Sequence, residues 1–144
     1  MGDTGSGAKP EFVHLRHLAW AAPAALAGAV GAVLVVRFIA VWLLEPPPAF
    51  SPLGVVAPVI FTVVSVSAAI VVFVLVACVA NRPFRTYRIL AFLALVASLV
   101  PTFSVGRSSM AGAGWTAAGA LIIMHVVAWA VTVEVLTRTT TDDH

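Results

Sequence analysis

Two ionisable side chains stand inside long apolar stretches of the sequence, where a charge is costly to keep. Arg37 lies in the stretch 18–44, and His125 lies near the middle of the stretch 115–136. On membrane-insertion scales a central arginine costs about 2.5 to 3.5 kcal/mol, so such a residue is a candidate functional group. The guanidinium can bind an anion or a carboxylate, and the imidazole can carry a proton near neutral pH.

Arg37 has two interpretations. It lies about six residues, or about 9 Å, beyond the middle of its stretch, so its long side chain can reach the nearer membrane surface or bind backbone carbonyls. Alternatively, it forms an anion or substrate-carboxylate site open to that surface. No acidic residue of another stretch stands at the same depth, and Glu45 at the end of the same stretch comes nearest. We prefer the first, structural interpretation.

His125 shares a helical face with Trp129 and Thr132, at spacings of four and seven residues. One interpretation is a neutral imidazole that is hydrogen-bonded across the helix interface to Ser65, Ser67 or Ser98. The other is a proton relay. A metal or haem site is not expected, because the other histidines lie toward the chain ends. The candidate ligand-binding residues are therefore Arg37, His125, Trp129 and Ser98.

The sequence contains no other arrangement that is typical of catalysis. No serine, cysteine or threonine has a histidine base and an acidic partner at a matching depth, and no glycine-rich phosphate loop precedes a helix. The single cysteine, Cys78, excludes an internal disulfide and a cysteine metal cluster within one chain. We therefore expect a protein that is not an enzyme and that has no catalytic residues, metal or cofactor.

The elements that position these residues are four apolar stretches. Of the 144 residues, 61% are hydrophobic and 10% are charged, whereas soluble domains have about 25% charged residues. One helical crossing of a bilayer needs about 20 apolar residues. The stretches are 18–44, 55–80, 89–105 and 115–136. They predict an all-α integral membrane protein, folded as an antiparallel bundle of four transmembrane helices.

The domain organisation follows from these stretches. Residues 1–10 are polar and glycine-rich, which predicts a disordered tail. Residues 11–138 form the single membrane domain, and 139–144 form a second tail. The first stretch is longer than the apolar region of a cleaved signal peptide, which has about 7 to 15 residues, so we expect a retained span.

The basic residues of the connections are unevenly distributed. One side of the predicted bundle has only Arg107, and the other side has all the remaining basic residues of the tails and connections. This larger set is Lys9, Arg16, Arg82, Arg85, Arg88 and Arg138. Because lysine and arginine stay preferentially in the cytoplasm, we expect both termini there.

The arginines of the second connection, Arg82, Arg85 and Arg88, are expected to contact lipid headgroups. They lack the aromatic interleaving of a nucleic-acid surface, so no nucleic-acid partner is expected. Glu134 lies near the end of the last stretch on the same side, and we expect it to form an interfacial ion pair with one of these arginines.

Helices in lipid associate through close packing of small residues. Ala24, Gly28 and Ala32 recur every four residues in the first stretch, and Ala27 and Gly31 repeat the spacing on an adjacent strip. They predict a packing face, mainly for contacts within the bundle and otherwise for oligomerisation. Pro101 lies inside the third stretch, so we expect that helix to kink or fray there, with Ser98 satisfying a freed carbonyl.

The second half of the chain also carries a family resemblance. It rests on RPFRTYRILAFLALVASLVPTFS and, after a loop of small residues, on GWTAAGALIIMHVVAWAVTVEVL. These strings resemble a family of small four-span actinobacterial membrane proteins known only as a domain of unknown function. The family's basic turn, serine/proline motif and Met-His pair match Arg82, Pro83, Arg85, Ser98, Pro101, Met124 and His125. The resemblance covers residues 82–136 and implies four spans in a bacterial plasma membrane, but no activity.

Two functional classes remain open. The first is a non-catalytic membrane component that packs with itself or with a larger membrane-protein partner in the lipid bilayer. The second is a small transporter or ligand-binding bundle with a polar site around Arg37 and His125. The second class requires both side chains to face one water-accessible cavity, so their positions in the fold distinguish the two.

Overall fold

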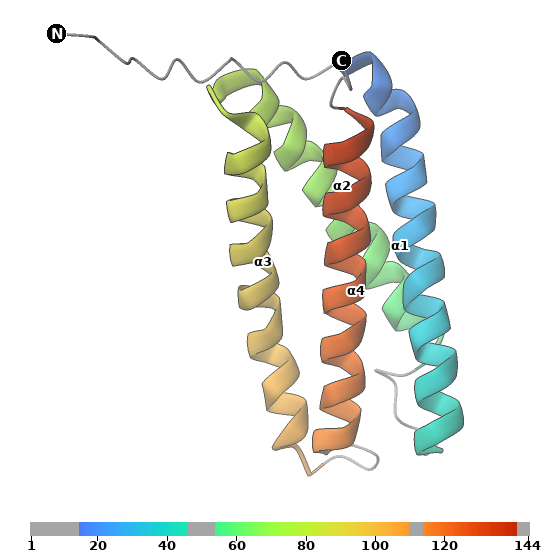
Figure 1. Cartoon of the computed structure of the whole chain (residues 1–144). Helices are drawn as coiled ribbons and strands as arrows, with labels where there is room; N and C mark the ends of the chain where they lie inside the picture. Colours follow the sequence, from blue (N-terminus) through green and yellow to red (C-terminus); the bar gives the residue numbers. More distant parts are fainter. Residues whose placement is uncertain (1–14, 46–53, 110–113, 141–144) are drawn as a thin grey trace, which may run out of the picture.

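The computed structural model describes residues 15–45, 54–109 and 114–140, and in these residues it contains four α-helices and no strand (Figure 1). The helices are α1 (Leu15–Leu44), α2 (Val56–Val79), α3 (Pro83–Gly106) and α4 (Trp115–Thr139). Each is long and apolar enough to cross a membrane. The predicted all-α bundle of four spans is confirmed. Residues 1–10 and 141–144 of the predicted tails lie outside the described residues.

The helix α3 begins six residues before the predicted start of its span, at Pro83. Proline suits this position because its fixed φ matches the helix and its missing N–H has no partner in a first turn. As a result, Arg85 and Arg88 lie on the helix itself, and Arg82 precedes it as the N-cap residue.

The predicted fraying at Pro101 is wrong, because α3 continues through this residue to Gly106. Proline has no N–H for the carbonyl of Ala97, four residues earlier. The Ser98 hydroxyl donates instead to the carbonyl of Leu95, at 2.7 Å. Ser98 therefore bonds within α3, but not to the carbonyl that Pro101 frees.

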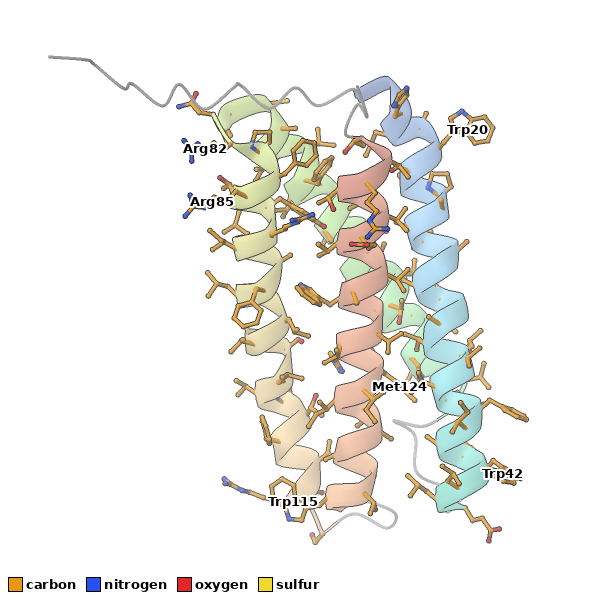
Figure 2. The ribbon with its side chains drawn as sticks, in the orientation of Figure 1. Trp20, Trp42, Arg82, Arg85, Trp115 and Met124 are labelled. Carbon is orange, nitrogen blue, oxygen red and sulfur yellow. The ribbon has the colours of Figure 1, made fainter. Side chains whose placement is uncertain are left out.

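The helix α4 lies between α1 and α3, and α2 crosses obliquely behind it (Figure 1). The contact between α1 and α4 is the most extensive in the bundle. At one end α1 and α3 begin and α2 and α4 end, and we call it the arginine end because Arg82 and Arg85 project there (Figure 2). Trp20 is near this end, whereas Trp42 and Trp115 lie at the opposite end (Figure 2). Exposed tryptophans at both ends fit the two interfaces of a bilayer.

The core consists of two clusters. Near the arginine end, Phe73, Tyr87 and Leu136 are buried with a row of alanines from α1. Near the opposite end, Met124 lies between α4 and α1 and packs with Val33 (Figure 2). Most other large apolar side chains are exposed, as lipid contact requires. The helix α3 is the least buried of the four.

The buried face of α1 differs from the predicted one. The structure buries Ala21, Ala25, Ala29 and Val33, whereas Ala24 and Gly28 are exposed and Ala32 is half-buried. Both sets repeat every four residues, so spacing alone does not separate them. The buried face is the one that meets α4 and α2, because the three alanines share a cluster with side chains of both helices.

Candidate functional site

Arg37 and His125 stand at similar depths on different helices. Arg37 is seven residues before the end of α1 and His125 is ten residues after the start of α4, so they lie about 10 and 15 Å from the same end of the bundle. Their depths therefore allow a shared site. Whether the two residues form one depends on the direction in which each side chain points.

His125 lies on the side of α4 that faces α3. It is one turn from Trp129, whose ring meets Phe92 of α3 at a centroid distance of 6.5 Å. Arg37 belongs to α1, which packs on α4 from the other side (Figure 1). The structure therefore does not bring the two residues into one site.

The His125 ring is bonded to its own helix. Its Nδ1 lies 2.7 Å from the carbonyl oxygen of Leu121, and because a carbonyl only accepts, Nδ1 must be the donor. Ser98 also bonds within its own helix. The predicted hydrogen bond between His125 and Ser98 is absent from the described contacts, since each side chain satisfies a backbone carbonyl nearby.

Arg37 lies at the margin between the core and the outer surface of α1. Its neighbour Val36 packs against the cluster near the opposite end, whereas Phe38 and Ile39 on its other side are exposed. The Arg37 residue itself is half-buried. This position matches a long side chain that runs along the protein surface.

A shallow, open hollow occurs on the outer face of α4. Its lining is mostly apolar and consists of Trp129, Ala130, Val131, Val133 and Glu134. Of the predicted ligand-binding residues, only Trp129 borders it. The residues that the structure describes contain no group of three histidine, cysteine or acidic residues that could hold a metal ion. The hollow is thus open and mostly apolar, with Glu134 as its charged lining residue.

Aromatic packing joins α2 to α3 near the arginine end. The Phe73 ring meets Tyr87 edge-on at 4.9 Å, and it lies 6.3 Å from Phe84. The buried Tyr87 Oη and Trp129 Nε1 have no hydrogen-bond partner among the residues that the structure describes, and each such group carries a desolvation cost. The sequence interpretation missed this cluster; the single tyrosine in an apolar helix was the available signal.

The basic side chains of the arginine end make two described polar contacts. Arg88 donates to Thr137 Oγ1 across the seam between α3 and α4 at 3.3 Å, and Thr137 donates in turn to the Val133 carbonyl at 2.8 Å. Glu134 pairs with Arg138, four residues later, at 2.5 Å. The predicted pairing of Glu134 with an arginine of α3 is wrong, because Arg138 is on the same helical face and nearer.

Neutralising Glu134 is expected to change the stability very little. The side chains of Glu134 and Arg138 are 51% and 78% exposed, and exposed pairs at this spacing contribute about 0.3 to 0.5 kcal/mol. We expect Glu134→Gln to lower the free energy of unfolding by no more than about 0.5 kcal/mol, measured by denaturation with SDS in mixed micelles. A loss of about 2 kcal/mol would contradict this account of the carboxylate.

Small residues of α1 border the hollow on α4. A Cβ atom added to Gly28 would lie 3.1 Å from Cγ1 of Val131, a lining residue, whereas one added to Gly31 meets no atom within 4 Å. Ala24 and Ala27 are exposed beside them. We call Ala24, Ala27, Gly28 and Gly31 the small strip. The small strip is exposed on α1, and at Gly28 it adjoins the lining of the hollow on α4.

The four long apolar helices, packed with their large apolar side chains outward, define a small multi-pass helical membrane protein. No protein-family model matches the chain, and searches of curated proteins and of solved structures found no significant match.

Proposed function

We propose that this protein is a non-catalytic membrane component that associates with another transmembrane helix through the small strip and the adjoining hollow. The observation that supports this most directly is the exposure of Gly31, with open space where a side chain would stand. The partner is a second copy of the chain or a larger membrane protein, and the experiment below distinguishes them.

The physical reason is the nature of association in lipid. Hydrocarbon solvates an apolar helix as well as a second helix does, so association depends on close approach and van der Waals contact. Ala24, Ala27 and Gly31 present little side chain, so a partner backbone can come close to α1. Ala130 of α4 is also small and exposed, and it lines the hollow, so a partner helix can come close there too.

We expect Gly31→Leu to weaken this association by about tenfold, or about 1.4 kcal/mol. The new side chain would hold the partner helix away from α1. The measurement is energy transfer between labelled copies in liposomes, together with pull-down from native membranes. The matched control is Val64→Leu, which enlarges an exposed residue of α2 outside the small strip.

The outcomes separate the possible partners. Energy transfer that falls in Gly31→Leu and persists in Val64→Leu supports self-association. Absence of energy transfer, with a membrane protein captured by the parent chain and lost from Gly31→Leu, supports a larger partner. Association that is equal in all three chains contradicts the proposed face.

The orientation is part of the same proposal: both termini in the cytoplasm of a bacterial plasma membrane. Its support is the distribution of basic residues, with Arg82, Arg85, Arg88 and Arg138 at one end and Arg107 at the other. The bacterial assignment rests on the resemblance of residues 82–136. A fluorescent protein fused after His144 is expected to fluoresce, and alkaline phosphatase fused after Arg107 is expected to be active. The reverse pair of results would contradict the orientation.

A further inference from the structure

One exposed face of α3 combines two arginines with a row of apolar side chains. A helix turns by about 100° per residue, which places Arg85, Ile89, Leu93 and Val96 within an arc of about 80°. Arg82 precedes the helix and projects from the same side as Arg85 (Figure 2). We call these five residues the α3 stripe. Ile89, Leu93 and Val96 are 52%, 57% and 48% exposed, so the stripe lies open to lipid.

The charge at the head of the stripe is not neutralised within the described residues. Glu134 is the described acidic residue of the arginine end, and it pairs with Arg138 on α4. Arg88 turns toward α4 and donates to Thr137. Arg82 and Arg85 are exposed and make no described polar contact. Two guanidinium groups one turn apart are therefore available to the same anion.

The dimensions match one leaflet of a bilayer. From Arg85 to Val96 the helix rises about 16 Å, close to half of a hydrocarbon layer about 30 Å thick. The arginines thus stand at headgroup depth when the apolar residues stand in the acyl region. A guanidinium presents paired N–H donors that fit the oxygens of a phosphate.

We propose that the α3 stripe binds an anionic phospholipid. The phosphate lies between Arg82 and Arg85, and one acyl chain runs along Ile89, Leu93 and Val96. The charge of the two arginines selects an anionic over a zwitterionic headgroup, and the apolar residues select a lipid over a free phosphate. This site lies on α3, so it is independent of the small strip on α1 and of the orientation in the membrane.

The test is native mass spectrometry of the purified chain in detergent, titrated with phosphatidylglycerol or with phosphatidylcholine. We expect the parent to retain phosphatidylglycerol preferentially. The double variant Arg82→Gln/Arg85→Gln is expected to bind it about 25-fold more weakly, since each basic residue at a membrane surface is worth about fivefold. The double variant to lysine keeps the charge and is expected to recover most of the affinity.

Two controls assign the source of the effect. Arg107→Gln removes an exposed arginine at the other end of α3, and it is expected to leave lipid binding unchanged. Glycerol phosphate, which lacks acyl chains, is expected not to displace the lipid. Equal binding by the parent and the glutamine variant overturns the proposal, as does equal retention of the two lipids. Displacement by glycerol phosphate at the same concentration as lipid overturns the role of the apolar residues.

Discussion

Replacing Phe73 with alanine is expected to lower the free energy of unfolding by about 3 kcal/mol. Phe73 is 0% exposed and its ring contacts Tyr87 and Phe84 of α3. The helix α2 packs mainly on α1 and less on α3, and the Phe73 ring lies in the cluster where side chains of all four helices meet. We place the loss at the lower end of the range for phenylalanine, because lipid solvates the separated helices.

The measurement for Phe73→Ala is denaturation with SDS in mixed micelles, followed by the fluorescence of Trp129 in a chain with its other tryptophans replaced. The matched control is Phe61→Ala, which makes the same substitution on the same helix at a residue that is 72% exposed. We expect the control to change stability by less than about 0.5 kcal/mol. Equal losses in the two variants would contradict the aromatic cluster as the contact between α2 and α3.

The second large effect is expected from Gly28→Leu. Gly28 is at the exposed edge of the α1–α4 contact, and a Cβ atom there would lie 3.1 Å from Cγ1 of Val131, so a leucine must push this side chain of α4 aside. Overpacking of a close contact costs about 1 to 3 kcal/mol, and we expect about 2 kcal/mol here. The α1–α4 contact is the most extensive in the bundle, so a disturbance at this position is expected to lower the stability of the whole fold.

The control for Gly28→Leu is Gly31→Leu in the same helix. Gly31 has no atom within 4 Å of an added Cβ, so the free energy of unfolding is expected to stay unchanged, measured in detergent micelles at a protein concentration where the chain is monomeric. This pair separates packing within the chain from association between chains. If Gly31→Leu unfolds as readily as Gly28→Leu, the assignment of Gly31 to an outer face is wrong.

The number and type of the helices follow from the sequence because each apolar stretch matches the thickness of a bilayer. The start of α3 does not follow from the sequence, because Arg85 and Arg88 resemble residues of a polar connection. The structure carries them on the first turns of a helix that begins at Pro83. An arginine tolerates that place because its side chain can reach water from the edge of a span.

The candidate site was predicted from the free-energy cost of placing Arg37 and His125 inside a membrane. That cost depends on the depth of each residue and not on the direction of its side chain. The two residues lie at similar heights along the bundle, but on different sides of α4. Glu134 also illustrates the difference between needing a partner and having a particular one. Its charge predicted an arginine partner, and in the structure that partner is Arg138 of the same helix. Composition predicts which groups need partners, whereas the fold selects the partners.

Residue composition and order are enough to predict four apolar helices with basic residues concentrated at one end. The buried side of each helix became known from the packed fold: Ala25 rather than Ala24 is buried in α1, and Phe73 is buried in α2. In water, a polar face would have marked the outside of a helix. In lipid both faces are apolar, so the buried face is chosen by the shapes that fit together, and these exist only once the helices have packed.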